Sequence, residues 1–524
     1  MKSKYRVILL MAACLLWSYF FWPNSSYQSV LFDQIAPSVV ATVGPYAHSH
    51  EKCRRYFDIV RALASSPPSN SRYLSGDQIS NHVDHLRMYL KCHLDLRLNE
   101  TVESALMGGE LLPMFSGELP LAPSQNWTSF LSNSGYYWAR YLQASRGRGI
   151  VISLDDANAE FACRLLQVLH HLSNTLPIQF IHKGDLSASS IDRLLRMAKG
   201  KQIVEFMDVS PTLKRGYGTA FRGYNNKWFA TLFSTFDEII LMDADVVPFV
   251  NPETFFELDG YKRTGAYFFR DRELSERISQ AQFDFFTSLI PKSDTIFNFT
   301  IDQVNHENNF FKFRSKHVME SGVVVLQRSS HLLGILISLA LQYWFRSGRI
   351  MYGDKDLFWL GQLISGNTKF HFNENAAAAI GTIEANNTIC STQLGHFSKE
   401  RELLWTNGAL NVCKRNTWLF DFLKYSHLRE KFNYSIFQIR DSYKGPVEFR
   451  QAILPASIER LNKPNLTQIA SRFKKDHNRG CGGIYYCASS DGGGELIHFS
   501  LQEQERYRRI ILAWSCPLLS IFQS

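Results

Sequence analysis

The stretch Ile239–Ile240–Leu241–Met242–Asp243–Ala244–Asp245 places two carboxylates, two residues apart, at the end of an apolar run. Such a run is typical of a buried strand, whose carboxyl end is where an α/β sheet binds ligands. The spacing lets both acids approach one cation, and their hard oxygen atoms suit Mg²⁺ or Mn²⁺, which can hold a diphosphate. Asp243 and Asp245 are therefore candidate metal ligands and catalytic residues. The competing interpretation is an ordinary strand followed by a solvated acidic turn.

The residues before this motif alternate between strand and helix patterns. Strand-like apolar runs and amphipathic helical patterns follow each other in the order 149–154, 161–172, 177–181, 191–197, 202–207, 227–233 and 238–242. A strand, a helix and a second strand within about 35 residues indicate a parallel βαβ unit. We therefore predict an α/β fold with a doubly wound, Rossmann-type sheet.

The N-terminus has the pattern of a membrane anchor. Three basic residues within the first six positions precede an uncharged apolar run at 7–22, and no Lys or Arg follows before Lys52. Positive charge on the N-terminal flank alone predicts a cytoplasmic N-terminus and a luminal body. A cleaved signal peptide is the alternative, although aromatic rather than small residues end the run.

Sequons and cysteines support a luminal body. Seven Asn-x-Ser/Thr sequons are candidate glycosylation sites: Asn24, Asn99, Asn126, Asn298, Asn386, Asn433 and Asn465. Of nine cysteines, eight lie outside the apolar N-terminal run, and an even number in an oxidising compartment favours disulfides. Cys481 and Cys487 bracket a glycine-rich stretch and are candidates to close a small loop.

Composition predicts one large catalytic domain with appendages. The 524 residues are 45% hydrophobic, which excludes a disordered chain, and the net charge of +9 is not gathered into a stripe, so no nucleic-acid partner is expected. The predicted divisions are a cytoplasmic tail at 1–6, a transmembrane signal-anchor at 7–22, a stem at 23–50, a helical accessory region at 51–146, a catalytic domain at 147–440 and a C-terminal extension at 441–524.

Several blocks in order resemble the fungal α-1,3-mannosyltransferases of glycosyltransferase family 71. Together they cover roughly 149–415 and include 227–230, 234–238, 242–248, 251–252, 265–272, 320–324, 352–359, His396 and 403–408. The resemblance implies a GT-A-like nucleotide-sugar-binding domain, GDP-mannose as donor and Mn²⁺, with Mg²⁺ as the alternative. It also implies a type II Golgi membrane protein that adds mannose to the terminal α-mannose of N- or O-linked mannan with retention of configuration, in Golgi enzyme complexes.

The resemblance also implies roles for further residues. Asp354 and Asp356, at a loop-to-helix junction, become catalytic residues near the donor sugar, and His396 becomes the third metal ligand. Donor binding is assigned to Lys227, Arg272, Lys355, Glu320 and Gly322. Five of these residues also have a structural alternative.

The structural alternatives are ordinary ones. Asp354 would cap the helix at 357–363, Arg272 would pair with Asp271, and Gly322 would form a bulge or a close approach. Lys227 would stabilise the acidic end of the strand or be a surface lysine, and a lone histidine such as His396 would be structural.

Other functions fit part of the pattern. Asp-x-Asp-x-Val after a strand also fits haloacid-dehalogenase-type phosphatases, but there the motif opens the domain, whereas three predicted strands precede it here. Val246 and Val247 follow the acidic pair where related α-1,2-mannosyltransferases look more like Asp-Ala-Asp-Asn, which favours the α-1,3 linkage. An α-1,2 linkage, another nucleotide-sugar donor and a non-catalytic glycan-binding Golgi protein are the remaining alternatives.

Overall fold

The computed structural model confirms the alternation of strands and helices that leads to the acidic pair. The elements in chain order are β1 (Arg148–Ser153), α8 (Ala159–His171), β2 (Ile178–His182), α9 (Ala188–Ala198), β3 (Val204–Asp208), α10 (Lys227–Phe233) and β4 (Glu238–Met242). β1 pairs in parallel with both β2 and β4. The helices between the strands supply the crossover that each parallel pair requires.

The structure describes most of the chain from residue 32 to residue 515. The described ranges are 32–63, 72–99, 101, 108–122, 125, 127–132, 135–221, 223–272, 276–291, 293–294, 296, 299–300, 308–351, 353–384, 387–413, 416–456, 471–475, 480–481, 484–491 and 493–515.

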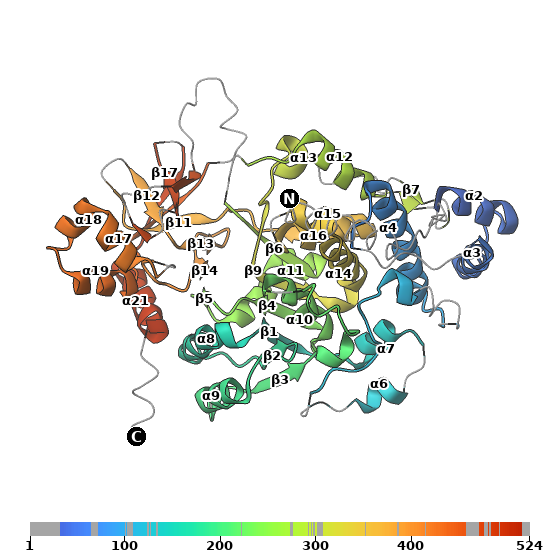
Figure 1. The fold of residues 1–524 in the computed structure, drawn as a ribbon, viewed down its shortest axis with the longest axis horizontal. Helices are drawn as coiled ribbons and strands as arrows, with labels where there is room; N and C mark the ends of the chain where they lie inside the picture. Colours follow the sequence, from blue (N-terminus) through green and yellow to red (C-terminus); the bar gives the residue numbers. More distant parts are fainter. Residues whose placement is uncertain are drawn as a thin grey trace, which may run out of the picture.

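A seven-stranded sheet forms the centre of the molecule, in the order β10-β6-β9-β4-β1-β2-β3 (Figure 1). The long strand β9 (Met319–Gln327) lies antiparallel between β4 and β6 (Ala266–Arg270), and the short β10 (His371–Phe372) forms the edge. The pairing of β6 with β9 shifts register between Phe268 and Phe269. This bulge lies beside Glu320–Ser321–Gly322 and changes the direction in which those residues point.

Helices cover both faces of this sheet. Successive residues of β1 point to opposite faces, so Val151 joins one hydrophobic core while Ile150 and Ile152 join the other. The first core is closed by α10, α14 (Arg328–Tyr343) and α16 (Lys355–Ser365). The second core is closed by α8 and α9.

A second, antiparallel sheet adjoins the first and also contributes to the site. Its six strands are β18 (Glu495–His498), β15 (Gln451–Leu454), β11 (Ala378–Gly381), β13 (Leu394–Phe397), β14 (Leu403–Asn407) and β5 (Val246–Pro248), in spatial order. Because β4 belongs to the first sheet and β5 to the second, the segment Asp243–Ala244–Asp245 lies at the junction of the two sheets.

The predicted C-terminal extension is part of the catalytic body, so the predicted boundary at residue 441 is wrong. It falls inside α19 (Ile436–Lys444). β15 and β18 extend the second sheet, and α21 (Leu501–Ser515) packs on α8, where the rings of Phe161 and Trp514 stack 6.4 Å apart. The local pattern missed this because β15 pairs with β11, which is distant in sequence.

The described part of the predicted accessory region contains helices. Its helices are α3 (Ser49–Leu63), α4 (Gly76–Leu90), η1 (Lys91–Asp95), α6 (Thr128–Ser132) and α7 (Tyr137–Ala144). A further helix, α2 (Phe32–Val43), lies in the predicted stem but packs Ile35 and Val39 against Tyr56. The stem prediction is therefore wrong over α2, because its apolar face has a partner in α3.

The predicted anchor at 7–22 lies outside the described residues. Within the ranges given above, no helix combines the length and the apolar character that crossing a bilayer requires.

Two disulfides are present among the described residues. Cys53–Cys92 joins α3 to η1, and Cys390–Cys487 joins β12 (Thr388–Ser391) to β17 (Ile484–Ser489). The predicted Cys481–Cys487 pair is wrong, because Cys487 lies directly opposite Cys390 in an antiparallel register. Cys481 is a buried thiol, and its hydrogen bond with Cys413, together with burial, raises its pKa.

Two predicted glycosylation sites are exposed. The side chains of Asn99 and Asn433 are open to solvent, so both positions are accessible to a glycan. The other candidates lie outside the described residues: Asn24, Asn126, Asn298, Asn386 and Asn465.

The remaining described elements are short. They are η2 (Asp156–Asn158), η3 (Ser210–Thr212), η4 (Gly223–Asn226), η5 (Pro252–Glu257), α11 (Asp259–Thr264), α12 (Gln280–Leu289), β7 (Ser293–Asp294), β8 (Phe299–Thr300), α13 (Asn309–Phe313), α15 (Phe345–Ile350), α17 (Trp418–Lys424), α18 (Ser426–Lys431) and β16 (Ser471–Lys475).

Candidate active site

A buried lysine connects four segments of the chain at the end of β4. The ammonium group of Lys227, the first residue of α10, lies 2.9 Å from the carboxylate of Asp243 and 3.2 Å from that of Asp354. It also donates to the carbonyl and hydroxyl oxygens of Ser321, at 3.0 and 3.1 Å. Lys227 therefore joins α10 to the end of β4, to β9 and to the loop before α16.

These contacts change the roles predicted for Lys227. It is buried, so it is not a surface lysine. Its three N–H donors face four protein oxygens, which leaves none for a donor phosphate. Its predicted contact with the donor therefore has no geometric support, and its position is that of a counter-ion for Asp243 and Asp354.

Two carboxylates share this one ammonium group, and the charge of Asp245 acts on Asp243. Burial is the largest effect that raises the pKa of Asp243, to about 7, and the charges of Asp245 and Asp354 raise it too, while Lys227 lowers it. Burial opposes the charged form of Lys227, but Asp243 and Asp354 outweigh it and hold the Lys227 pKa above its ordinary value. The cluster thus carries more negative charge than Lys227 neutralises.

The backbone fixes the acidic pair between the two sheets. The N–H of Asp243 donates to the carbonyl of Gly322 at 2.9 Å, and the carbonyl of Asp245 accepts the N–H of Ala409 at 3.1 Å. Asp243 is thus tied to β9 of the first sheet and Asp245 to the loop after β14 of the second.

A second buried network lies beside the first. The ammonium group of Lys355 lies 2.8 Å from both the Asp271 and the Glu320 carboxylates, and Arg272 donates to Asp271 at 2.7 Å. Burial opposes ionisation of Asp271, but Arg272 and Lys355 hold its pKa well below the ordinary value. Burial also opposes ionisation of Glu320, and Lys355 is the main group that lowers its pKa.

This network gives Arg272 and Lys355 protein partners. The alternative interpretation of Arg272, pairing with Asp271, is confirmed. Asn407, at the end of β14, donates to the other oxygen of Glu320 at 3.3 Å, so the network also bridges the two sheets.

Asp354 and Asp356 have different environments although they are two residues apart. Asp354 precedes α16 as its N-cap residue, but its carboxylate makes no capping hydrogen bond and faces Lys227 instead. Asp356 accepts the backbone N–H groups of 317, 318 and 319 at 2.8–3.1 Å and the indole N–H of Trp359 at 3.1 Å. Asp356 fixes α16 to β9, and its predicted catalytic role has no geometric support.

His396 is fully buried and lies in an aromatic stack. Its ring lies 3.8 Å from that of Trp405, nearly parallel, and neither ring nitrogen has a hydrogen-bond partner among the residues that the structure describes. Burial lowers the pKa of His396 to about 4, so the imidazole is neutral at pH 7.

Gly322 allows this stack to approach β9. A Cβ atom at Gly322 would lie 2.8 Å from the Trp405 ring and 3.1 Å from Val246. The alternative interpretation of Gly322, a close approach beside a bulge, is therefore confirmed. Gly322 acts on the site through packing and through its carbonyl bond with Asp243.

Two of the three predicted metal ligands fit a divalent cation. Asp243 and Asp245 offer hard oxygen atoms in a cluster with excess negative charge, which is the environment that Mn²⁺ or Mg²⁺ requires. In the described part of the chain, no three His, Cys, Asp or Glu side chains are grouped so that they would hold a metal ion. The predicted role of His396 as third ligand is therefore not supported.

Sequence reasoning missed several residues of the site. Ser321 binds Lys227, Asn407 binds Glu320, and Trp405 carries the histidine stack. The sequence predicted Asp271 only as a partner of Arg272, whereas Asp271 is the centre of the second network. All four positions lie within the family-like blocks, but nothing in their local patterns indicated these contacts.

Comparison with known proteins gives concordant matches. The family model Mannosyl_trans3, which describes mannosyltransferases, matches residues 147–398. The chain is similar to the α-1,3-mannosyltransferase MNT2 of Saccharomyces cerevisiae, with 32% identity over 407 residues, which is 72% of this chain and 70% of the relative. It is also similar to α-1,3-mannosyltransferase MNT3 of the same organism, with 30% identity over 94% of this chain and 86% of the relative.

One solved structure with a weaker match is the X-ray structure of the mannosyltransferase Ktr4p from S. cerevisiae. It aligns with a TM-score of 0.30 and 11% identity, over 60% of this chain and 83% of that one. No residue role is taken from it.

Proposed function

The chain belongs to the family of fungal α-1,3-mannosyltransferases and is a glycosyltransferase, and we propose that it transfers mannose from GDP-mannose to the terminal α-mannose of an N- or O-linked mannan. The observation that carries this proposal is the pairing of Lys227 with Asp243 and Asp354 at the carboxyl end of β4, where the charge of Asp245 also acts on Asp243. In an α/β sheet this is the edge where ligands bind.

We propose that Asp243 and Asp245 hold Mn²⁺, with Mg²⁺ as the alternative. When bound, the ion neutralises the diphosphate of the donor and stabilises it as a leaving group. Lys227 opposes the rise in the pKa of Asp243 that burial causes, and its ion pairs hold the Asp243 and Asp354 carboxylates in place. It is thus a positioning residue.

Asp354 is the proposed donor-sugar residue. Its carboxylate does not cap α16 but pairs with the same ammonium group as Asp243. It therefore lies next to the proposed diphosphate position. There a carboxylate orients a sugar hydroxyl by accepting its hydrogen bond. The second network, Lys355 with Asp271 and Glu320, holds the start of α16 against β9 and keeps this geometry rigid.

We further propose retention of configuration, a GT-A-like catalytic domain and a Golgi location. Family membership supports an α-linked donor and an α-linked product, which together mean retention. The acceptor hydroxyl would then attack from the face that the diphosphate leaves. The apolar run at 7–22, the sequons and the two disulfides support a type II membrane protein with a luminal body.

The test is sugar transfer by the full chain with GDP-mannose, Mn²⁺ and α-linked mannobiose, with a panel of UDP-sugars beside it. We expect mannose transfer that EDTA abolishes, and α-1,3 linkage in the product. The Asp243→Asn and Asp245→Asn variants should lose at least about a hundredfold in kcat, because they remove charge that stabilises the transition state. The exposed Asp441→Asn variant is the matched control.

Each other outcome would change a specific part of the proposal. Transfer from a UDP-sugar alone would overturn the donor. An α-1,2 product would overturn the linkage. Glycan or nucleotide binding without turnover would overturn the transfer itself in favour of a binding protein.

A further inference from the structure

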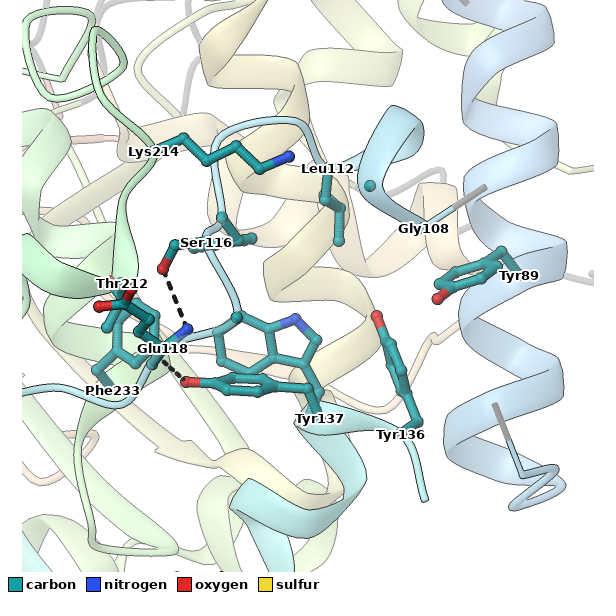
Figure 2. A pocket seen from close by; sticks show the side chains of 14 residues that line it. Tyr89, Gly108, Leu112, Ser116, Glu118, Tyr136, Tyr137, Thr212, Lys214 and Phe233 are labelled. Atoms are coloured by element: carbon teal, nitrogen blue, oxygen red, sulfur yellow. Dashed lines mark hydrogen bonds between the residues drawn. The ribbon is translucent and has the colours of Figure 1, made fainter. Parts of the chain in front are cut away.

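A cavity of about 340 Å³ lies where the accessory helices meet the catalytic body (Figure 2). Its lining comes from α4, from the segment 108–118, from the start of α7, from the residues after β3 and from the end of α10. The lining residues are Tyr89, Gly108, Gly109, Leu112, Phe115, Ser116, Gly117, Glu118, Tyr136, Tyr137, Trp138, Thr212, Lys214 and Phe233. None of them belongs to the cluster around Lys227, and we call this space the aromatic cavity.

Aromatic rings form most of the wall. Tyr136 packs edge-to-face on Tyr89 with ring centres 5.5 Å apart, and Trp138 packs edge-to-face on Tyr137 at 5.1 Å. Trp138 also contacts Phe233 at 5.2 Å. These contacts fix the rings before any ligand arrives, so binding costs little side-chain entropy.

Hydrogen bonds hold the loop that carries the polar edge of the cavity. The hydroxyl of Tyr137 donates to the carbonyl of Glu118 at 3.0 Å, and the N–H of Glu118 donates to the hydroxyl of Ser116 at 3.1 Å (Figure 2). Glu118 is thus anchored through its backbone, which leaves its side chain for other contacts.

Two opposite charges lie at this polar edge. Glu118 and Lys214 are both exposed lining residues, and neither charged group forms an ion pair with a residue that the structure describes. Burial raises the pKa of the nearby Glu110 and Lys214 opposes this rise, so the edge offers acceptors as well as a donor and favours a ligand whose polar groups bind both. A purely apolar ligand would leave both charges unused.

Sugars meet both requirements. The carbon faces of a pyranose ring stack on aromatic rings, and its hydroxyl groups bind carboxylates as donors and ammonium groups as acceptors. The volume lies at the lower end of small-ligand sites, about 300–1,000 Å³, which suits a short oligosaccharide segment.

We propose that the aromatic cavity is a second, non-catalytic binding site for a mannose oligosaccharide, which retains a remote part of the glycan acceptor. The choice of mannose rests on the proposed mannosyl transfer, whereas the sugar class rests on the cavity itself. Nothing in the reacting centre is needed for this binding.

The cavity and the active site are linked by a single short helix. α10 begins at Lys227 in the site and ends at Phe233 in the cavity wall, so the two lie about 9 Å apart along the helix axis at 1.5 Å per residue. Mannobiose that binds at the active site leaves the cavity empty, whereas a longer or branched glycan can bind in the cavity too, which raises the local concentration of its other ends.

The first measurement is binding of α-linked mannotetraose to the full chain without donor, by isothermal calorimetry and saturation-transfer NMR. The variants are Tyr137→Leu, which removes an aromatic face, and Lys214→Met and Glu118→Gln, which remove charges at exposed positions. We expect each to weaken binding by about tenfold, or about 1.4 kcal/mol. Tyr434→Leu and Lys201→Met, an exposed tyrosine and an exposed lysine elsewhere, should bind as the unmodified protein does.

The second measurement is transfer kinetics. We expect the cavity variants to raise KM for a long mannan-type acceptor by about tenfold, with KM for mannobiose and kcat unchanged. If the unmodified chain does not bind mannotetraose, or if all three variants bind it as tightly as the controls, the proposal is overturned. If Tyr137→Leu fails to fold, mannotetraose binding by Lys214→Met and Glu118→Gln decides whether the proposal holds.

This result separates the two proposals. Loss of mannotetraose binding in a chain that transfers no mannose would support the cavity and reject the proposed reaction. Normal mannose transfer with unaffected mannotetraose binding in the variants would support the reaction and reject the cavity.

Discussion

The ammonium group of Lys227 lies 2.9 Å from the carboxylate of Asp243, and this pair connects the first turn of a helix to the end of the strand that the helix precedes. The same ammonium group faces Asp354, so the charge balance of the whole cluster depends on one side chain. A site with this arrangement should respond to substitutions at Lys227 in both stability and activity.

Lys227→Met should destabilise the fold and abolish transfer. It leaves the buried Asp354 carboxylate and the partly exposed Asp243 carboxylate without their counter-ion, which costs about 3–5 kcal/mol in the free energy of unfolding. The double variant Lys227→Met/Asp354→Asn removes one of those charges and should regain part of the stability without regaining activity. Denaturant unfolding measures the stability, and additive losses in the double variant would contradict the coupling.

Substitutions at Asp354 and Asp356 should have different effects, the first on activity and the second on stability. Asp354→Asn should leave the thermal midpoint within a few degrees of the unmodified protein and lower kcat by about a hundredfold. Asp356→Ala should do the opposite, because it orphans three backbone N–H groups and an indole N–H, at about 1–3 kcal/mol or more. Calorimetry and kcat per folded molecule provide the comparison, and equal kcat losses in both variants would contradict it.

Cation affinity should depend on pH near neutrality. Asp243 has a pKa of about 7 in the fold, so below that value a proton competes with the cation for the carboxylate. We expect the affinity for Mn²⁺ to fall by up to about tenfold per pH unit from pH 7 to pH 5. Titration calorimetry at several pH values measures it, with proton release on binding as a second signal. An affinity independent of pH would exclude Asp243 as a ligand.

The Asp243 carboxyl also makes the stability of the metal-free chain depend on pH. Stability falls as the pH rises, whereas the cation affinity rises. The pKa of Asp243 is above 3.8 in the fold, so the folded state retains a proton that the unfolded chain loses. The contribution of Asp243 to the free energy of unfolding therefore falls as the pH rises from about 4 to about 7. Asp243→Asn should remove this part of the pH dependence, as followed by denaturant unfolding.

Gly322→Ala should disturb the stack behind the site. Its Cβ would lie 2.8 Å from the Trp405 ring, so β14 or β9 must shift, at a cost of about 1–3 kcal/mol. The matched control is Gly381→Ala in β11, where the nearest atom would lie 3.6 Å from the new Cβ. Thermal unfolding measures both, and equal midpoints for the two variants would contradict the close-approach interpretation.

Disulfide mapping should find Cys53–Cys92 and Cys390–Cys487. Non-reducing digestion and mass spectrometry check this, and a Cys481–Cys487 peptide would contradict the structure. Cys53–Cys92 closes a loop with a sequence separation of 39, so the paired substitution to Ser should lower the free energy of unfolding by about 4 kcal/mol.

Local patterns were sufficient for the first half of the fold. The observed bounds of α10 and β4 coincide with the predicted ranges 227–233 and 238–242, because each element is a short apolar segment between polar breaks. Asp243 and Asp245 could be placed at a strand end for the same reason.

Contacts between distant segments could not be predicted in this way. Lys355 and its two partners, Asp271 and Glu320, lie in three separate segments of the chain, and nothing in their own neighbourhoods indicates the pairing. The disulfide shows the same difficulty, because Cys487 has Cys481 nearby in sequence but Cys390 opposite in the sheet. His396 was predicted as a ligand from the family resemblance, whereas its surroundings are the rings of Trp405 and Phe269.

The second sheet also affects the order in which the molecule can assemble during synthesis. Its strand β5 follows the acidic pair directly, whereas its far edge, β18, is close to the end of the chain. At about 5–20 residues per second, the roughly 250 residues between them take about 12–50 seconds to synthesise. During that interval β5 is present in the nascent chain, but the other strands of its sheet have not all been synthesised. The second sheet is therefore completed only after about 250 further residues have been synthesised.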